Sequence, residues 1–558
     1  MNEQPWILGI SASHNGSACL LKGDEIVVAI QEERLSRVKR HRIRGAGPSN
    51  AVAYCLDYAG ISPCDLSLVV LCVQGRLSDE IHDIRREPLL NVISHNTPTL
   101  TIPHHYGHAF SAFATSGFKE SAVLIVDGAG SPVTDFTAEE LKLLNGASAD
   151  AWETISLYYA SATDIVPLEK HVVERGAWLM MHDGEMPSFG SLGGMFSATA
   201  QQIFGEVTEA GKVMGLAPYG QAIFPANDFF DIVKGRFHFK DTVPLRFRHH
   251  ERWPNCTSEY ETLAGSVQSA LEEALLYLVQ HVRELSGSEN LCYAGGVALN
   301  SVANERIIRQ SGFKNVYIIA AAEDSGTSIG AAYYGLWQLT KQNSLRQILH
   351  DAPGRRYSLA NISAALNCNT NVRVAHSNDV LADAAELLCD GKITGWFDGG
   401  SELGPRALGQ RSILCDPRRP DGKGILNRRV KMREAFRPFA PAVLLEEAAN
   451  WFEFGDTTPE SPFMLRVVPV NAEKKEKVPA IVHVDGTGRV QTLTRENNGR
   501  FYELVKKFHE KTGVPMLLNT SFNRMGQPII ETPADAIECL LNTGLDCCVF
   551  EDRIVFKA

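Results

Sequence analysis

WILGISASHNGSACLLKGDEIVVAI, residues 6–30, contains three β-prone runs separated by two short turns. Trp6–Ser11 and Ser17–Leu21 flank His14-Asn15-Gly16, and Lys22-Gly23-Asp24 leads into Glu25–Ile30. Turn residues of this kind between apolar runs are typical of hairpins. The stretch therefore predicts a three-stranded antiparallel meander.

The same pattern returns later in the chain. Leu66–Val73 is a further apolar strand, and the pattern restarts at Ala122–Val126, with Thr154–Ser161 and Ile165–Val173 as the next strands. Strand and helix then alternate over Leu291–Ala294, Val297–Arg309, Val316–Ala322 and Ser328–Leu339. Meanders followed by βα crossovers, occurring twice, predict two related α/β halves that close on a cleft.

A domain boundary is expected between Gln342 and Leu359, where periodicity is lost and Pro353 and Gly354 appear. We therefore expect one domain over residues 1–345 and a second over residues 355–558. The second is expected to be α/β, with helices at Asp379–Leu388 and Phe501–Lys511 and strands at Ile393–Phe397, Ala440–Leu445, Met464–Val468, Ala480–Val484 and Met516–Leu518.

Composition places the chain among ordinary globular proteins. Of its 558 residues, 44% are hydrophobic and 21% are charged. Apolar runs such as Val316–Ala322 are far shorter than the roughly 18 residues of a membrane span. No secretory signal is visible, and the 12 cysteines form no CxxC pair. These features predict a soluble, cytoplasmic protein with reduced thiols.

The charge is unevenly distributed. The chain carries a net charge of −11, yet Pro405–Arg437 holds ten Lys and Arg residues against three acidic ones. An acidic chain is a poor candidate for wrapping nucleic acid. A solvated face would explain the basic run, but interleaved Gly, Pro and apolar residues favour a site for small anions, phosphates above all.

Two histidines have the spacing of metal ligands. His104 and His108 follow Pro103 in a predicted helix, four residues apart and therefore on one face. Asp127 and Asp324 each follow a predicted strand and offer carboxylate oxygens. Mixed His and carboxylate ligation suits iron(II), manganese or zinc. The alternative is that these are helix-terminal histidines bonded to backbone.

Glycine-rich segments also follow strands in the first domain. Gly128 stands at one strand end, and Gly295-Gly296 leads through to Asn300 at another, where backbone N–H groups are able to face an anion. Lys212 lies between them in sequence and is a candidate phosphate contact. The alternatives are ordinary turns and a surface lysine.

The second domain contains a denser set of anion-binding candidates. Gly399–Leu414 holds several glycines with Arg406 and Arg411, which make a cradle with bidentate donors. Further candidates lie in the segments that follow: Lys431, Arg437, Arg489, Asn519 and Ser521. So many fixed cationic and polar donors at the mouth of one site would cost free energy unless a strongly charged ligand, such as a triphosphate with another phosphate, bound there.

Taken together, the motifs resemble the O-carbamoyltransferase family of antibiotic, nodulation-factor and toxin biosynthesis. The resemblance spans nearly the whole chain and rests on Ser13–Ala18, the two histidines, Gly211–Ala217, Gly295–Asn300, Gly404–Gly409, Phe436–Pro441 and Leu518–Asn523. It implies an N-terminal duplicated actin/sugar-kinase-like (ribonuclease-H-like) fold followed by a YrdC-like twisted open α/β domain.

The resemblance also implies an enzyme with two sites. In the C-terminal domain, Lys431, Arg489 and Ser521 match positions that bind ATP and carbamoyl phosphate, Met464 matches one lining that site, and the carbamoyl group would be adenylated to carbamoyl-AMP. In the N-terminal domain, His104, His108, Asp127 and Asp324 match an iron(II) site, with His14 and Lys39 near the adenylate. There the acceptor hydroxyl would attack, and AMP would leave.

The expected function is therefore ATP-dependent O-carbamoyl transfer in natural-product biosynthesis. The expected partners are carbamoyl phosphate, ATP with Mg²⁺ and a small-molecule hydroxyl acceptor, with no nucleic acid and no membrane, and homodimer formation is left open. Two alternatives are a threonylcarbamoyl-type transferase that acts on tRNA and a nucleotide-binding regulator without turnover. The acidic charge outside the basic segments argues against tRNA.

Overall fold

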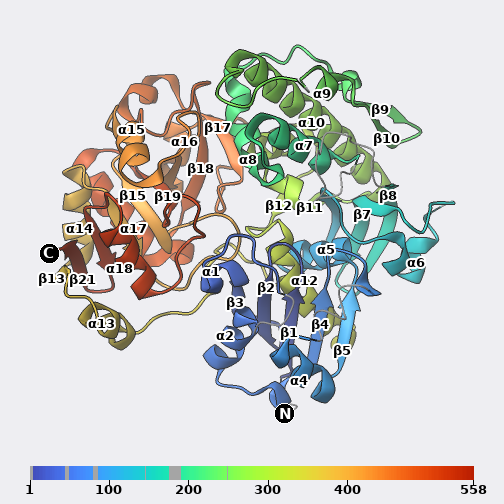
Figure 1. Cartoon of the computed structure of the whole chain (residues 1–558), viewed down its shortest axis with the longest axis horizontal. Helices are drawn as coiled ribbons and strands as arrows, with labels where there is room; N and C mark the ends of the chain where they lie inside the picture. The colour runs from blue at the N-terminus through green and yellow to red at the C-terminus, as the bar shows by residue number, and fades with distance from the viewer. Residues whose placement is uncertain (1–3, 44–48, 79–85, 145, 175–189, 248) are drawn as a thin grey trace. The chain divides into compact units, whose positions relative to one another are not determined.

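The computed structural model describes residues 4–43, 49–78, 86–144, 146–174, 190–247 and 249–558 (Figure 1). The chain divides into two compact units, of which the first holds Met1–Val27 with Arg42–Ile348 and the second Val28–His41 with Leu349–Ala558. Among the described helices, none combines the length and apolar character needed to cross a membrane.

The first sheet of the N-terminal unit begins with the predicted meander. Its five strands lie in the order β3-β2-β1-β4-β5, with β1 antiparallel to β2 and parallel to β4. The strands are β1 (Trp6–Ser11), β2 (Ser17–Lys22), β3 (Glu25–Gln31), β4 (Leu68–Cys72) and β5 (Thr99–Ile102). Every residue of β4 is buried, as in strands covered on both faces.

The second sheet repeats this topology. Its order is β12-β11-β6-β7-β8, again an antiparallel meander followed by two parallel strands. The strands are β6 (Glu120–Val126), β7 (Trp152–Ser161), β8 (Ile165–Val173), β11 (Asn290–Ala294) and β12 (Asn315–Ile318). The expected duplication of an actin/sugar-kinase-like (ribonuclease-H-like) fold is therefore confirmed.

Two helices lie between the duplicated sheets. Helix α12 (Thr327–Thr340) packs on β1, β2 and β4, while α5 (His104–Ala114) packs on β6 and β11, and the two helices pack against each other. The remaining elements of this unit are α2 (Asn50–Ala59), α4 (Pro88–Asn96), α6 (Ala138–Leu141), α7 (Leu192–Phe204), α8 (Ala210–Leu216), β9 (Phe230–Val233), β10 (Arg236–Phe239), α9 (Thr242–Arg246), α10 (Thr257–Ser286) and α11 (Ser301–Gln310).

The contact between α5 and α12 depends on glycine. A Cβ atom built on Gly330 would lie 1.8 Å from the carbonyl oxygen of Gly107, and one on Gly9 would lie 2.1 Å from that of Ser328. Both separations are far below a van der Waals contact, so only residues without a side chain allow α12 to sit this close to α5 and β1.

The C-terminal unit is an open α/β domain, as expected. Its sheet has nine strands in the order β13-β21-β20-β14-β15-β19-β16-β18-β17. The strands are β13 (Val372–His376), β14 (Thr394–Phe397), β15 (Arg411–Cys415), β16 (Ala440–Leu444), β17 (Arg466–Pro469), β18 (Thr487–Leu493), β19 (Met516–Ser521), β20 (Cys547–Phe550) and β21 (Arg553–Lys557).

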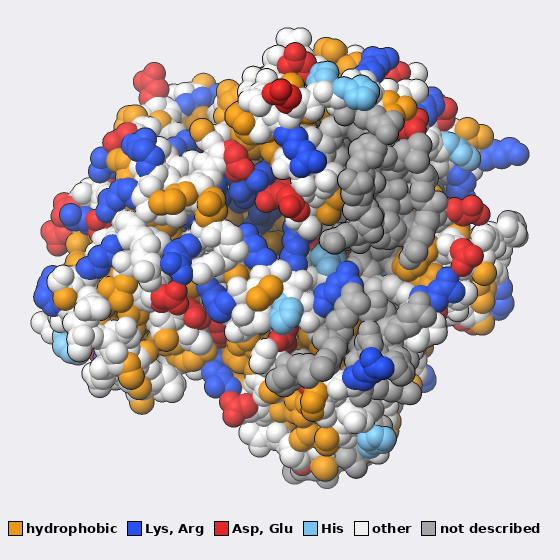
Figure 2. All heavy atoms as spheres, in the orientation of Figure 1, with side chains coloured by type: hydrophobic (Ala, Val, Ile, Leu, Met, Phe, Trp, Pro, Cys, Tyr) orange, Lys and Arg blue, Asp and Glu red, His pale blue; other side chains and the backbone are white. Residues whose placement is uncertain are grey.

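Six helices of this unit pack with the sheet around one large apolar core. They are α13 (Leu359–Asn367), α14 (Val380–Cys389), α15 (Gly422–Leu426), α16 (Leu445–Trp451), α17 (Arg495–Thr512) and α18 (Pro533–Leu541), and the unit also contains α1 (Glu32–Ser36). Figure 2 shows Lys and Arg side chains interspersed with Asp and Glu side chains over the face in view.

One predicted strand, Ala480–Val484, is wrong. The segment forms turns, in which Ile481 N–H donates to Val478 and Ala480 N–H donates to Pro417. Ala480 and Ile481 are fully buried. Their apolar character therefore reflects packing in the core and not membership of a sheet.

The glycine contact gives a stability prediction. Gly330→Ala should lower the free energy of unfolding by about 2 kcal/mol or more, because a methyl group is forced onto the Gly107 carbonyl. Chemical denaturation monitored by tryptophan fluorescence measures this change. The control is Gly211→Ala in α8, where the added Cβ meets no atom within 4 Å. Equal stabilities for the two variants would contradict the close-contact explanation.

Candidate metal centre and anion-binding site

Helix α5 presents His104 and His108 on one face. The helix begins at His104, directly after Pro103, so the two rings lie one turn apart. Their Nε2 atoms are 3.2 Å apart, and both side chains are fully buried. The predicted helical spacing is therefore present, and the Nε2 atoms of both imidazoles converge on the same position.

Two carboxylates meet this pair. Asp127 follows β6, and its Oδ2 atom lies 3.5 Å from His104 Nε2 and 3.4 Å from His108 Nε2. Asp324 lies beyond β12, and its Oδ1 atom lies 3.3 Å and 3.6 Å from the same nitrogens. One ligand atom from each of the four residues falls within 4.8 Å of every other.

The donor set fits a divalent metal. Two imidazole nitrogens and two carboxylate oxygens are ligands that iron(II), manganese and zinc share. Asp127 Oδ2 is buried and accepts no hydrogen bond within the described structure. Burial opposes charge on His104, but Asp324 and Asp127 outweigh it and raise the pKa of His104 well above its usual value. Convergence of buried acids and bases at strand ends is typical of a functional site.

His14 lies beside this cluster. Its Nδ1 atom is 3.0 Å from Asp324 Oδ2 and 2.9 Å from the Oε1 atom of Gln74. Gln74 in turn donates to the carbonyl of Ala129, next to Gly128. The imidazole of His14 is thus oriented by a carboxylate that also faces the two histidines.

The glycine candidates bring the strand ends together at Asp127. Gly295 has a φ of +97°, and a Cβ there would lie 2.2 Å from the carbonyl oxygen of Val126. Gly128 N–H donates to Asp127 Oδ1 at 2.7 Å, and a Cβ on Gly296 would lie 3.0 Å from the same oxygen. These glycines therefore allow close approach of backbone to a metal-ligand candidate.

Two further N-terminal candidates have partners within the protein. Asn300 caps α11 by accepting from Ala303 N–H, and its amide exchanges hydrogen bonds with Gln268. The Lys212 ammonium lies 3.3 Å from Glu209 and over the ring of Phe204.

A buried carboxylate that the sequence did not single out anchors the start of α5. Glu153 Oε1 accepts from the backbone N–H of His105 at 3.0 Å and of Ser131 at 2.9 Å. Its other oxygen is 2.5 Å from Lys170 Nζ, which also pairs with Glu140 at 2.6 Å. Glu153 and Lys170 lie in the neighbouring strands β7 and β8, where charged residues in an alternating pattern look like surface residues in the sequence. Only their pairing in three dimensions reveals this anchor.

The C-terminal unit contains a second cluster, built around Lys431. This lysine is 4% exposed, and its ammonium donates to Ser521 Oγ at 3.2 Å and to Asn523 Oδ1 at 2.7 Å. Burial, together with Arg433, Arg437 and the charge of Lys39, lowers the pKa of Lys431 well below its usual value. Asn523 lies at the end of the Leu518–Asn523 motif but is not among the ligand-binding residues that the sequence predicts.

Four arginines act on one another in the same unit. Burial, with Arg437 nearby, lowers the pKa of Arg406 to about 10 and that of Arg433 to about 9. Burial and the other three arginines also lower the pKa of Arg489 well below its usual value. The Nε atoms of Arg406, Arg433 and Arg489 are buried and bond to no acceptor in the described structure. Mutually repelling cations of this kind favour a polyanionic ligand.

Other candidates of this unit hold its loops. Asn519 donates to the carbonyl of Ala407 and to Gln491, and so supports the loop that carries Arg406. Arg411 is fully buried, donates to the carbonyls of Asp398 and Glu531 and lies over Phe397. Met464 is 2% exposed.

Backbone strain gathers in these segments. Six described residues other than glycine have positive φ, and they include Arg37, Arg40, Met432 and Met464. Met432 follows Lys431 directly. Such conformations cost free energy and concentrate at functional sites, which supports a binding role for this region. Lys39 lies between two of the strained residues, in the C-terminal unit, whereas His14 belongs to the N-terminal unit.

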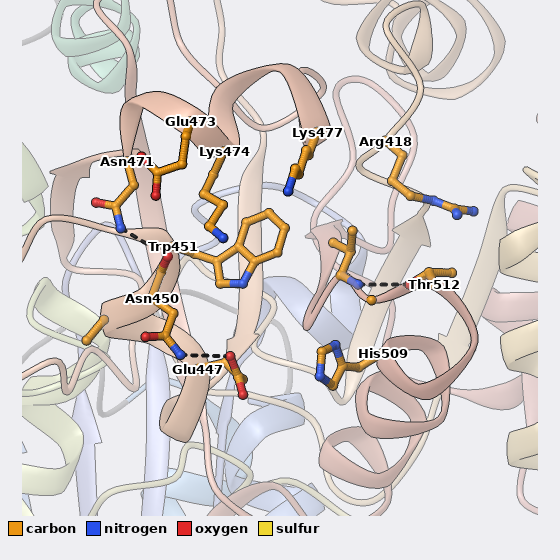
Figure 3. Close-up of a pocket in the computed structure, with 13 residues that line it drawn as sticks. Arg418, Glu447, Asn450, Trp451, Asn471, Glu473, Lys474, Lys477, His509 and Thr512 are labelled. Carbon is orange, nitrogen blue, oxygen red and sulfur yellow. Dashed lines mark hydrogen bonds between the residues drawn. The ribbon is translucent and has the colours of Figure 1, made fainter.

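A separate hollow of about 890 Å³ also opens in the C-terminal unit (Figure 3). The Lys474 ammonium lies over the ring of Trp451 there, and Arg418, Glu447, Glu473, Lys477 and His509 give it mixed charge. None of the residues selected from the sequence lines it.

Comparison with known families gives the class of this protein. Residues 6–91 and 90–333 match the family described as Carbamoyltransferase N-terminus, and residues 385–557 match Carbamoyltransferase C-terminus. The chain therefore belongs to the carbamoyltransferase family and is a carbamoyltransferase.

Named relatives cover most of the chain. It is 32% identical to Nodulation protein NolNO of Sinorhizobium fredii, over 98% of this chain and 79% of the relative, and 34% identical to Nodulation protein NolO of Bradyrhizobium diazoefficiens, over 81% and 78%. Among solved structures, T. kodakarensis HypF is 14% identical and covers 62% of this chain and 49% of its own, with a TM-score of 0.41.

Removing one imidazole should weaken metal binding. We expect His108→Ala to lower the affinity for Mn²⁺, Zn²⁺ or Fe²⁺ more than about tenfold, because one of four converging ligands is lost. Calorimetric titration of the metal-free protein, with metal analysis of the purified protein, measures this. The exposed His238→Ala serves as control. Unchanged metal content in the His108 variant would remove this residue from the ligand set.

Proposed function

We propose that the chain is an ATP-dependent O-carbamoyltransferase with an activating site in the C-terminal unit and a transfer site in the N-terminal unit. The observation that carries this proposal is the pairing, in one carbamoyltransferase, of a buried cluster of mutually repelling cations and a buried cluster of two histidines and two aspartates. The first suits phosphates, and the second suits a divalent metal.

The activating step joins carbamoyl phosphate to ATP. Hydrolysis of carbamoyl phosphate yields phosphate and carbamate, and a carbamate oxygen attacks the α-phosphorus of ATP, so that the bond to pyrophosphate breaks and carbamoyl-AMP forms. Arg406, Arg437 and Arg489 neutralise the phosphates, and Lys431, held by Ser521 and Asn523, donates to the reacting phosphoryl oxygens. Fixed cations are needed because two anions must approach each other.

The transfer step moves the carbamoyl group to a hydroxyl. The acceptor oxygen attacks the carbamoyl carbon, the hydroxyl proton passes to His14, and AMP leaves. Asp324, 3.0 Å from His14 Nδ1, orients this imidazole and stabilises its protonated form. His104, His108, Asp127 and Asp324 would hold the divalent metal, which when bound supplies a Lewis acid for the carbamoyl oxygen. We assign iron(II) as this metal on the family resemblance.

The acceptor is proposed to be a small molecule of a biosynthetic pathway. Two relatives that cover most of the chain are named nodulation proteins, which supports a role in making a secondary product. The net charge of −11 also favours a small molecule over a nucleic acid. The experiment incubates the enzyme with ATP, Mg²⁺, carbamoyl phosphate and a metabolite extract of the source organism. A product heavier by one carbamoyl group supports the proposal, and absence of carbamoyl-phosphate-dependent pyrophosphate release refutes it.

A Lys431 variant should distinguish the activating step from the transfer step. Lys431→Met should lower pyrophosphate release about a hundredfold or more, because a buried ammonium aimed at Ser521 and Asn523 is lost. Transfer from supplied carbamoyl-AMP should remain, as should bound metal. Coupled pyrophosphate detection and AMP release measure the two steps. Lys507→Met, which removes a partly exposed lysine paired with Asp379 in the same unit, is the control. A normal rate of pyrophosphate release in the Lys431 variant would place activation elsewhere.

A further inference from the structure

The segment Val28–His41 belongs to the C-terminal unit although it stands early in the sequence. It contains the end of β3, the short helix α1 and the residues up to His41. Helix α1 begins at Glu32, immediately after the last residue of β3, Gln31. The segment is basic, with Arg34, Arg37, Lys39 and Arg40.

Two side chains of this segment bind the backbone of a single residue, Gly404, in the arginine loop, Gly404–Gly409. Gln31 Oε1 accepts from the backbone N–H of Gly404 at 3.2 Å, and Arg34 donates from Nη2 to the carbonyl of Gly404. Gln31 and Arg34 are 3% and 1% exposed. Gly404 has a φ of +101° and precedes Pro405 and Arg406, so fixing the backbone on both sides of Gly404 fixes the position at which the loop holds Arg406.

A third side chain, Arg37, binds a second loop of the anion site, which contains Pro528 and Ile529. Arg37 Nη1 donates to the carbonyl of Ile529 at 2.8 Å, and Nη2 donates to that of Pro528 at 3.4 Å. The same loop is tied to Asn523, whose Nδ2 donates to the carbonyl of Gln527 at 2.7 Å. Because Asn523 Oδ1 receives a hydrogen bond from Lys431, Arg37 supports the partner of the central lysine.

The segment is itself held rigidly. Glu33 pairs with Arg34 and accepts from the backbone N–H of Arg40 at 2.8 Å. Arg37 and Arg40 have φ values of 61° and 55°, which residues with a side chain rarely adopt. Strain of this kind persists only where surrounding contacts over-determine the backbone. Two strained residues within four positions indicate that the surrounding contacts hold this segment in one backbone conformation.

We propose that Gln31, Arg34 and Arg37 form a clamp that positions both loops of the activating site, so that carbamoyl adenylation depends on residues from the N-terminal part of the sequence. This inference rests on the proposed function for its catalytic meaning. The three residues are positioning residues, since their hydrogen bonds go to loop carbonyls and amides. Losing the Arg34 donor leaves the buried carbonyl of Gly404 without this partner, which favours rearrangement of the loop.

The test uses the full-length enzyme and two readouts. Hydrogen–deuterium exchange without substrates should show exchange in the peptide covering residues 403–411 accelerated more than about tenfold by Arg34→Met, while β19 keeps its protection. Pyrophosphate release should show the KM for ATP raised about tenfold, with bound metal unchanged. Arg34→Lys, which retains one donor, should recover part of both effects.

Two further variants keep the test decisive. Arg37→Gln, at a partly exposed site, should accelerate exchange around residues 523–530 even if Arg34→Met folds poorly. Arg553→Met is the matched control, since Arg553 is a 9% exposed arginine that bonds to Asp552 and Ser363 in the same unit. It should leave exchange at residues 403–411 and the KM unchanged.

The outcomes separate this inference from the proposed function. Unaltered exchange in both loops of folded Arg34→Met and Arg37→Gln would overturn the clamp, whatever the activity. An equal KM increase in Arg553→Met would reduce the effect to general destabilisation and would also overturn it. A wild-type enzyme that releases no pyrophosphate would instead overturn the proposed function, while the exchange measurement still decides whether the clamp exists.

Discussion

The N-terminal unit depends on the close approach of helix α5 to helix α12. The two helices meet through Gly107 and Gly330, and α12 also lies against β1 at Gly9. This contact joins the layers of a duplicated fold and fixes the height of α5 over the second sheet. The height decides where His104 and His108 point, because both extend from α5 towards the ends of β6 and β12. The close packing of these glycines therefore determines the position of the two histidines.

The two clusters solve opposite electrostatic problems. In the N-terminal unit, two carboxylates and two imidazoles converge in a buried place and leave room for a cation to balance the acids. In the C-terminal unit, burial and mutual repulsion among the cations lower the pKa values of Lys431, Arg406, Arg433 and Arg489, which an anion would reverse. A carbamoyltransferase that activates its donor with a nucleotide has use for both arrangements.

Local signals predicted much of the fold and the candidates themselves. Alternating apolar runs and turn residues gave β1, β2 and β8 nearly to the residue, and helical spacing gave the two histidines of α5. Ala480–Val484 was misread because burial alone makes a sequence apolar. Glu153, Asn523 and the clamp residues could not be found from spacing, since each bonds to a group far away in sequence. Such contacts leave no periodic pattern.

The division of the chain has a consequence for chimeras. Residues 28–41 are separated from Leu349 by about three hundred positions, yet they fold with the C-terminal unit. A hybrid of two relatives joined only at the linker would therefore combine the arginine loop of one parent with Gln31, Arg34 and Arg37 of the other. A compatible exchange would have to transplant both pieces, because the module that folds as the C-terminal unit is discontinuous in the gene of this protein.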